Sequence, residues 1–157
     1  MLAIRTILVP TDFSDCSTAA LDYGRHLADA FGASLHVLHV VQDPYTQPWA
    51  AEAFPAPLGD LLVQWEDQAR ARIVEALPPE ERGRTTVVTQ IGSPFFEIVR
   101  YAQEQKVDLI VLGTHGRGPI GHMLLGSVAE KVVRKAPCPV LTVRHPNAPS
   151  VQLPAAS

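Results

Sequence analysis

The sequence predicts an α/β fold with a single doubly wound, open sheet of five parallel strands and helices on both faces. Three observations lead to this prediction. Short apolar runs rich in β-branched residues alternate with longer segments whose apolar residues recur every three or four positions. The resulting β-α-β-α-β-α-β-α-β order is typical of parallel sheets. The run Asp108–Gly113 is almost entirely apolar, as expected of a strand that is covered on both faces.

The first quarter of the chain predicts two strands with a helix between them. Ile4–Val9 and Ser34–Val41 are the strands, each rich in β-branched or apolar residues. Ser14 or Asp15 caps the intervening helix, and Gly32 ends it. The apolar residues that recur along this helix, and so define its expected inward face, are Ala20, Tyr23, Gly24, Leu27, Ala28 and Phe31.

A second helix is predicted over Leu58–Leu77, which two prolines follow. Its expected apolar face contains Leu58, Leu61, Leu62, Trp65, Ala69 and Ile73. The third strand is predicted at Thr85–Gln90, a segment rich in threonine and valine.

The third helix is predicted to open at Ser93 and Pro94, which are favourable residues for an N-cap and a first helical position. It continues to about Glu104, and Phe96, Val99 and Ala102 are expected to face inward. After the fourth strand, the last helix and the last strand are predicted at Ser127–Lys135 and Val140–Arg144.

The length of 157 residues fits one domain, which we expect to span residues 1–145. Within it, Gln42–Gly59 contains four prolines, too many for a regular helix or a central strand. A connection of this length is either a flap over a ligand or a tolerated surface insertion. Residues 146–157 are expected to form a flexible C-terminal tail.

The composition excludes several classes of function. Thirteen Lys and Arg against sixteen Asp and Glu give a formal charge of −3, which argues against nucleic-acid binding. Two cysteines, Cys16 and Cys138, are too few for a disulfide framework or a four-thiolate zinc site. No apolar stretch is long enough to span a membrane, and the first residues lack a signal-peptide pattern. We therefore expect a cytoplasmic protein.

The candidate binding site lies at the carboxyl ends of the strands, where open α/β sheets bind their ligands. The first strand leads into Pro10, Thr11 and Asp12, and the fourth leads into a glycine-rich segment that runs to the helix at Ser127. Gly126 and Ser127 stand at the N-terminus of that helix, where the helix dipole favours an anion such as a phosphate chain. The alternative is that the glycines only form a long turn.

Other catalytic and nucleotide-binding motifs are absent or out of place. Gly116-x-Gly118-x-x-Gly121 matches the dinucleotide fingerprint in letters, but it follows the fourth strand and contains Pro119. The sequence contains neither a P-loop nor a G-x-S-x-G serine-hydrolase motif. We therefore treat the dinucleotide match as accidental.

Histidine and cysteine patterns do not indicate a metal or a reactive thiol. His36 and His39 are three positions apart on a strand, so their side chains point to opposite faces. Cys16, in the first turn of a helix, is interpreted as a packing residue, and Cys138 as a buried turn residue. No metal ligands and no catalytic residues are predicted.

Three motifs in order resemble the universal stress protein (UspA-like) family over about residues 3–145. They are the segment Ile7–Ser14, the spacing Gly113-x2-Gly116-x9-Gly126-Ser127, and the segment from Gly126 to Val143. The glycine spacing resembles that of the family's ATP-binding branch. The resemblance implies the strand order 3-2-1-4-5, which places Asp12 next to Gly113.

The resemblance also implies a site for ATP, with AMP or ADP as alternatives and Mg²⁺ held only through the phosphates. It places Asp12 near the adenosine with Pro10 and Thr11 beside it, and Val40 and Leu112 against the base. The ribose and phosphates are then held by Gly113, Gly116, Gly126, Ser127 and Val128, and His115 and Arg117 add hydrogen-bond donors or charge.

Three functions stay open from the sequence. The protein is an ATP-binding stress-response or signalling module with little or no hydrolysis, a slow ATPase, or a dimeric scaffold without nucleotide. The resemblance implies a homodimer through the apolar strand Val140–Val143, which would otherwise leave an exposed sheet edge. Leu141→Pro is expected to remove a backbone donor from that edge.

Overall fold

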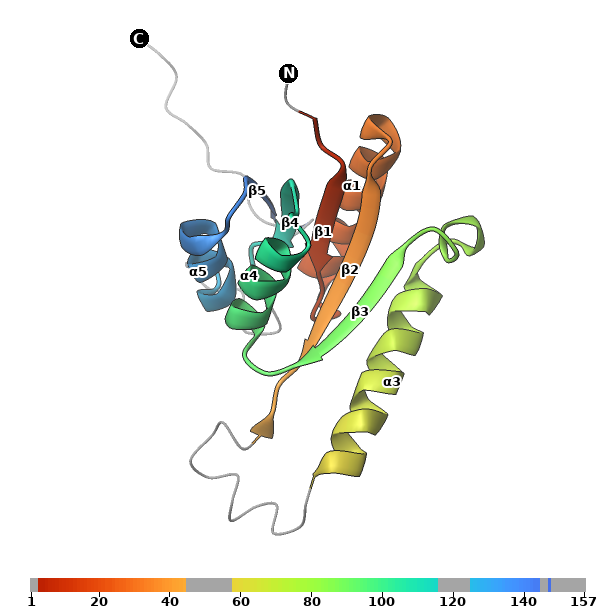
Figure 1. The fold of residues 1–157 in the computed structure, drawn as a ribbon, viewed down its shortest axis with the longest axis vertical. Coiled ribbons are helices and arrows are strands. Elements are labelled where there is room, and N and C mark those ends of the chain that lie inside the picture. Colours follow the sequence, from red (N-terminus) through yellow and green to blue (C-terminus); the bar gives the residue numbers. More distant parts are fainter. Residues whose placement is uncertain (1–2, 45–57, 116–124, 145–146, 148–157) are drawn as a thin grey trace.

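The computed structural model describes residues 3–44, 58–115, 125–144 and 147, in which a five-stranded sheet lies between two layers of helices (Figure 1). The strands are β1 (Thr6–Pro10), β2 (Ser34–Val41), β3 (Thr86–Ile91), β4 (Leu109–Gly113) and β5 (Val140–Val143). The helices are α1 (Asp15–Phe31), α3 (Gly59–Ala76), α4 (Pro94–Glu104) and α5 (Ser127–Lys135), with a 3-10 turn, η2, at Pro79–Glu81.

The strand order is β3-β2-β1-β4-β5, and every neighbouring pair is parallel. The order reverses between β1 and β4, so the chain winds outward from β1 in both directions. This arrangement confirms the predicted fold class. It also puts the carboxyl ends of β1 and β4 side by side, at the switch point where such sheets bind ligands.

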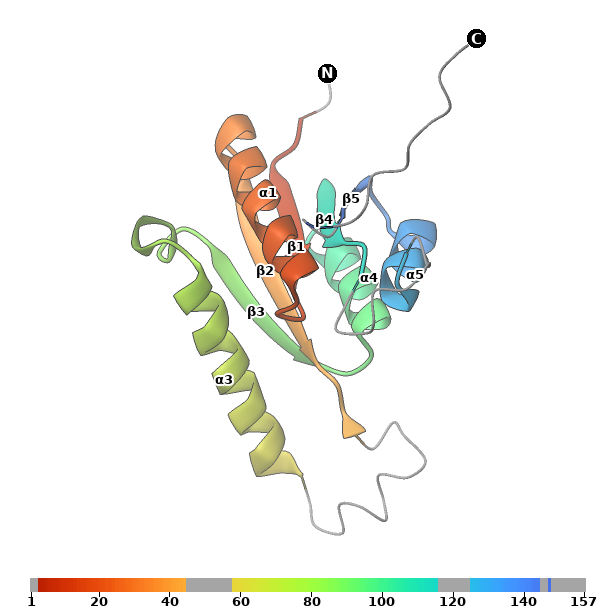
Figure 2. The ribbon, with the colours of Figure 1, turned by 180° about the vertical axis from the view of Figure 1, so that it is seen from behind.

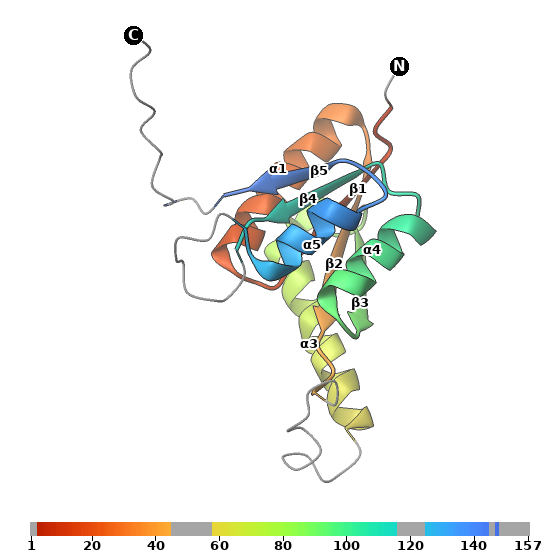
Figure 3. The same cartoon turned by 90° about the vertical axis from the view of Figure 1, so that its left-hand side faces the viewer.

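Helices cover both faces of the sheet, α1 and α3 on one face and α4 and α5 on the other (Figures 2 and 3). Alternate residues of the strands supply two separate hydrophobic cores because successive side chains point to opposite faces. The core under α1 and α3 includes Ile7, Val9, Leu35, Val37 and Val111. The core under α4 and α5 includes Leu8, Leu38, Val40, Ile110 and Leu112.

Helix α1 begins and ends where its sequence signals predicted. The Ser14 hydroxyl accepts a hydrogen bond from the Ser17 N–H, and Gly32 ends the helix in a left-handed conformation with φ of 63°. Gly24 allows α1 to lie directly on β1, because a Cβ at this position would overlap the side chain of Val9. The helix therefore packs unusually close to the central strand that leads into the site.

Three aromatic residues expected to face inward are exposed instead. On α1, the stripe that faces the sheet includes Ala20 and Gly24, and Tyr23 lies about 100° round the helix from Gly24. Phe31, at the end of α1, is also exposed.

On α4, apolar residues occur on more than one face, so the sequence alone did not decide which face of the helix lies against the sheet. In the structure, the face that packs on the sheet contains Ile98, Tyr101 and Ala102, and Phe96 is 58% exposed.

The two predicted irregular segments fall mostly outside the described residues. These segments are the proline-rich insertion at 42–59 and the tail at 146–157. At the end of the insertion, Leu58 is the N-cap of α3 and is buried in the structure. Within the described ranges, no helix is both long and apolar enough to cross a membrane.

A buried ion pair joins α1 to the connection between α3 and β3. The Arg25 guanidinium donates two hydrogen bonds to the Glu81 carboxylate, with Nε–Oε2 of 2.7 Å and Nη2–Oε1 of 2.9 Å. Glu81 is only 6% exposed. The hydrogen bonds from Arg25 hold the pKa of Glu81 below its usual value of 4.5, against the opposing effect of burial.

Because the pKa of Glu81 is lower in the folded than in the unfolded protein, its stabilising contribution is present above about pH 4.5 and is lost as the pH falls further. We expect Glu81→Gln to destabilise the protein at pH 7 and to flatten this acid-side decline. Urea unfolding measured between pH 7 and about pH 3 checks the prediction. Glu80→Gln, at the exposed neighbouring position, is the control. Parallel pH profiles for wild type and Glu81→Gln would contradict the assignment.

Candidate functional site

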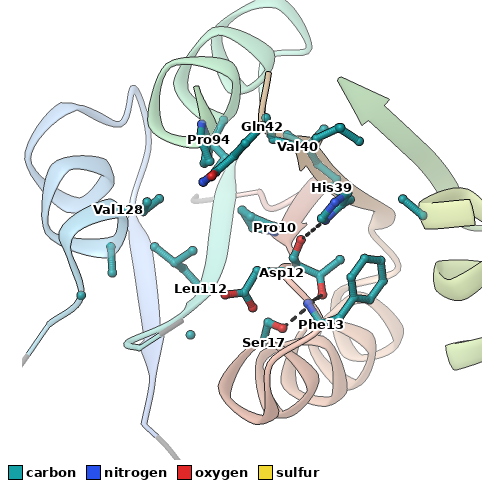
Figure 4. A pocket seen from close by; sticks show the side chains of 18 of the residues that line it. Pro10, Asp12, Phe13, Ser17, His39, Val40, Gln42, Pro94, Leu112 and Val128 are labelled. Atoms are coloured by element: carbon teal, nitrogen blue, oxygen red, sulfur yellow. Dashed lines mark hydrogen bonds between the residues drawn. The ribbon is translucent and has the colours of Figure 1, made fainter. Parts of the chain in front are cut away.

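A pocket of about 870 Å³ lies at the carboxyl ends of the strands (Figure 4). The residues that follow β1 and β4 form its centre, as the switch-point rule requires. Of the sequence-predicted site residues, those that line this pocket are Pro10, Thr11, Asp12, Val40, Leu112, Gly113, His115, Gly126, Ser127 and Val128. The other two, Gly116 and Arg117, lie outside the described residues.

A tight turn between β1 and α1 positions Thr11 and Asp12. The Thr11 N–H donates to the carbonyl of Leu38 at 2.8 Å, which continues the pairing of β1 with β2. The Thr11 hydroxyl accepts from the Phe13 N–H at 3.1 Å, and Asp12 Oδ1 accepts from the Ser14 N–H at 3.0 Å. These side chain–backbone bonds hold the turn, so the Asp12 carboxylate lies at the wall of the pocket (Figure 4).

Gly113 permits a close approach between the end of β4 and the first turn of α1. A Cβ built on Gly113 would lie 2.8 Å from the backbone carbonyl carbon of Cys16 and 2.9 Å from its Cβ. These distances are shorter than real contacts allow, so only glycine fits between the end of β4 and the first turn of α1. Cys16 is 2% exposed and fills this junction, in agreement with its interpretation as a packing residue.

Two backbone hydrogen bonds fix the start of α5 beside β4. The Thr114 N–H donates to the Val143 carbonyl at 2.8 Å, and the Gly126 N–H donates to the Thr114 carbonyl at 2.6 Å. Gly126 is the N-cap of α5, and within the described residues no side chain caps this helix. Its first N–H groups and its dipole therefore give this end of the pocket a partial positive charge.

The wall of the pocket on the α4 and α5 face is apolar. Val40 and Leu112 form it from the sheet, and both are less than 9% exposed. Pro94 and Val128 enclose the same space from the starts of α4 and α5 (Figure 4). An apolar wall with a carboxylate at one side and a helix N-terminus at the other suits a ligand with a flat apolar part and an anionic part.

The opposite wall contains residues that the sequence did not single out as site residues, namely Phe13, Ser17, His39, Gln68 and Arg72. His39 Nδ1 lies 2.8 Å from the Thr11 carbonyl oxygen, which can only accept, so Nδ1 carries the proton. The Phe13 and His39 rings are 4.7 Å apart. Phe13 itself has a φ of 64°, a left-handed conformation that sequence patterns do not predict for phenylalanine.

Trp65 and Ala69 were expected on the core-facing side of their helix. Ala69 is buried, whereas Trp65 is half-buried and lines the pocket with Gln68 and Arg72. The helical spacing of these residues was visible in the sequence. What it did not show is that this part of the helix faces a cavity and not the core.

The structure places the side chains of His36 and His39 on opposite faces of the sheet, as their spacing predicted. His36 Nδ1 lies 2.9 Å from the hydroxyl of Tyr101 on α4, whereas His39 faces the α1 side, so the two point to opposite faces. Burial lowers the pKa of His36 and raises that of Tyr101. In the part of the chain that the structure describes, no group of three His, Cys, Asp or Glu residues could hold a metal ion.

Cys138 is half-buried, less enclosed than the sequence suggested. Burial, with a smaller contribution from the charge of Asp108, raises the pKa of its thiol, so the thiol is protonated near neutral pH.

Together the fold and the pocket define a doubly wound α/β protein with a pocket at its switch point. The chain belongs to the universal stress protein family, whose family model matches residues 3–144. It is 35% identical over 143 residues to universal stress protein MJ0531 of Methanocaldococcus jannaschii, covering 91% of this chain and 84% of that protein.

Solved structures of similar proteins have the same fold. The structure of MJ0577, also from Methanocaldococcus jannaschii, matches with a TM-score of 0.76 at 31% identity and covers 93% of this chain and 99% of that chain. A universal stress protein in complex with cAMP matches with a TM-score of 0.60 at 29% identity, covering 91% of this chain and 98% of that chain.

Gly113→Ala should destabilise the protein, because the added methyl group must push the first turn of α1 away from β4. The expected loss is about 1–3 kcal/mol in the free energy of unfolding, the usual cost of overpacking a tight junction. Urea unfolding measures it. Gly83→Ala adds the same group where no atom lies within 4 Å of the new Cβ, so it is the matched control. Equal stability of the two variants would show that the junction has room to spare.

Proposed function

We propose that this protein binds an adenine nucleotide, ATP or alternatively AMP or ADP, as a stress-response or signalling module with little or no hydrolysis. The observation that carries the proposal is that one pocket joins an apolar wall, the Asp12 carboxylate and the N-terminus of α5. Membership of the universal stress protein family and the cAMP complex of a relative support it.

Each part of a nucleotide has a matching part of the pocket. Val40 and Leu112 provide the apolar surface for the base, and Asp12 provides a hydrogen-bond acceptor for the ribose or the base. The phosphates lie at Gly126, Ser127 and Val128, where backbone N–H groups and the helix dipole favour negative charge. His115, Gly116 and Arg117 complete the proposed site, and Mg²⁺ binds only through the phosphates.

We expect the protein to hydrolyse ATP slowly at most, because the described part of the pocket contains so few carboxylates. Phosphoryl transfer to water needs a group that positions the water and, usually, a metal ion held by carboxylates. Among the described lining residues, Asp12 is the only carboxylate, and we assign it to the nucleoside. The role is therefore binding, and the pocket lacks a second acidic group in its described part that would turn it into a hydrolase.

Asp12→Ala and Gly126→Val should each weaken ATP binding by about tenfold or more, which corresponds to about 1.4 kcal/mol. The first removes the acceptor for the nucleoside. The second places a branched side chain at the helix N-terminus, where the phosphates approach the backbone. The Gly126 backbone has φ of −69° and ψ of 161°, which valine adopts readily, so the expected effect is on the ligand. Isothermal titration calorimetry with ATP measures both.

Two controls separate binding from folding. Asp12→Asn keeps an oxygen that accepts from the Ser14 N–H and removes the charge, so it preserves the turn. Gly83→Val repeats the glycine-to-valine change at the opposite edge of the sheet, where nothing lies within 4 Å of the new Cβ. Unchanged ATP affinity in Asp12→Ala and Gly126→Val, or absence of ATP binding in the wild type, would overturn the proposal.

We also propose a homodimer in which two copies of β5 pair antiparallel. β5 is at the edge of the sheet, paired with β4, and Leu141 is 40% exposed. Pairing of two edges closes both sheets at once and stops further growth.

The direction in which each backbone N–H of β5 points determines which proline substitution tests this dimer. The carbonyls of Pro139 and Val143 accept from N–H groups of the β4 side, at 3.0 and 2.8 Å. Backbone groups alternate in direction along a strand, so Leu141 also faces β4, whereas Val140 and Thr142 face outward. The expectation that proline at 141 removes an edge donor is therefore wrong: it removes a bond within the sheet.

Thr142→Pro should shift the protein from dimer to monomer without unfolding it, because an outward-facing N–H is the one that an edge strand can lose. Light scattering at tens of micromolar, with the thermal unfolding temperature alongside, measures both effects. Leu141→Pro should instead lower the unfolding temperature. A monomeric wild type, or a fully dimeric Thr142→Pro variant, would contradict the proposed interface.

A further inference from the structure

The nucleotide site proposed above leaves one side of the pocket without a role. This side is the face of α3 formed by Trp65, Gln68, Ala69 and Arg72, all of which line the pocket. Their spacing of three, four and seven positions places them on one face of the helix. At a rise of 1.5 Å per residue, Trp65 and Arg72 are about 10 Å apart along the helix axis. The face is therefore long enough to contact a ligand group and its substituent together.

Arg72 is held at this face by an aromatic contact. Its guanidinium carbon lies 3.9 Å from the centre of the Phe13 ring, close enough for a cation–π interaction. Phe13 directly follows Asp12, so the cation stands next to the residue assigned to the nucleoside. Among the described residues that line the pocket, Arg72 is the only arginine or lysine.

The two parts of the pocket that favour anions are at opposite ends of it. Helix α3 packs on β2 and β3, whereas α5 packs on α4 and β5. The Arg72 guanidinium itself lies over Phe13, just after β1, and two strand spacings separate β1 from β5, about 10 Å at 4.8 Å each. The phosphates of a mononucleotide at the N-terminus of α5 would leave Arg72 unused. A ligand that contacted both the N-terminus of α5 and Arg72 would need a second aromatic group with polar substituents in addition to the first nucleoside.

The chemistry of the α3 face suits a second nucleotide unit. An indole ring such as that of Trp65 stacks on nucleobases of any type. A glutamine amide such as that of Gln68 offers both donors and acceptors to the edge of a base. A guanidinium pairs with phosphate oxygens through two parallel N–H donors. All three residues line, from one helix, the pocket that contains the proposed adenosine site.

We propose that the α3 face is a second nucleotide subsite, so that the pocket binds a dinucleoside polyphosphate more tightly than it binds ATP. This inference rests on the proposed nucleotide site. In the proposed complex, one adenosine lies at Asp12, Val40 and Leu112. The second base stacks on Trp65, and Arg72 binds the phosphate chain at its α3 end.

The test compares ATP with diadenosine tetraphosphate by isothermal titration calorimetry in the wild type and in two variants of α3. We expect diadenosine tetraphosphate to bind the wild type about tenfold more tightly than ATP, or about 1.4 kcal/mol. Trp65→Ala and Arg72→Gln should each remove most of that advantage and leave the ATP affinity within about twofold, or about 0.4 kcal/mol.

Matched variants control for charge and for packing. Arg70→Gln removes a positive charge from the same helix, but Arg70 donates to the Val87 carbonyl at 2.9 Å on β3, outside the pocket, so it should leave the advantage intact. Trp65→Phe keeps an aromatic plane and should restore part of the advantage lost in Trp65→Ala.

Tryptophan fluorescence gives a second readout. The chain contains two tryptophans, so Trp49→Phe leaves Trp65 as the only tryptophan whose emission is measured. Stacking of the second base should quench this emission with diadenosine tetraphosphate, and ATP should quench it less.

Each remaining outcome rejects the second subsite in a distinct way. Equal affinity for the two ligands, or an advantage that survives Arg72→Gln and Trp65→Ala, would overturn it while leaving the proposed ATP site in place. Equal weakening of both ligands by Arg72→Gln would mean that Arg72 binds the phosphates of a mononucleotide, which also overturns it. Binding of neither ligand would overturn the proposed function together with the second subsite.

Discussion

The close approach of β4 to the first turn of α1 is the constraint on which the site depends. Gly113 lies against the backbone and the side chain of Cys16 with no space for a Cβ. This contact brings the glycine at the end of β4 beside the Thr11–Asp12 turn at the end of β1, and the Thr114 backbone then holds the start of α5. A larger residue at 113 would separate the three segments that form the centre of the pocket.

Backbone hydrogen bonds, more than side-chain contacts, carry this arrangement across the sheet. The Thr114 N–H donates to the carbonyl of Val143 in β5, and the Thr114 carbonyl accepts from the Gly126 N–H at the start of α5. This one buried residue therefore links β4 to the edge strand β5 and to α5. At the end of β1, the Thr11 N–H donates to the carbonyl of Leu38 in β2, and the Thr11 carbonyl accepts a hydrogen bond from His39 Nδ1. The centre of the pocket is therefore held by backbone hydrogen bonds between neighbouring elements, which favours a preorganised binding site.

The sequence was sufficient to predict the order and type of the helices and strands because each carried a strong local signal. Ser14 and Gly32 bound α1, and the apolar run of β4 could only belong to a strand covered on both faces. Helix phase was harder to predict. On α4, several faces carry apolar residues, and only contact with the sheet decides that Phe96 stays exposed and Ile98 does not.

The residues of the candidate site were predictable in part, for a similar reason. Asp12 and Gly126 stand where strand ends and helix starts are visible in the sequence. Arg72 contacts Phe13, 59 positions away, through the packing of α3 on the sheet, and no local pattern distinguishes it from an ordinary exposed arginine. The direction of the Leu141 N–H is another property of the tertiary register. Local patterns thus locate backbone-built parts of a site better than side chains that a distant helix contributes.

The hydrogen bond between the Gly126 N–H and the Thr114 carbonyl also bears on how this family can diversify. The Gly126 nitrogen lies 2.6 Å from the Thr114 carbonyl oxygen, so the two ends of the intervening segment are held together beside the sheet. Closing a longer loop costs little additional free energy, about 0.6 kcal/mol for each doubling of its length. Insertions, deletions and substitutions between these two residues can therefore accumulate during evolution without displacing Ser127 or the sheet.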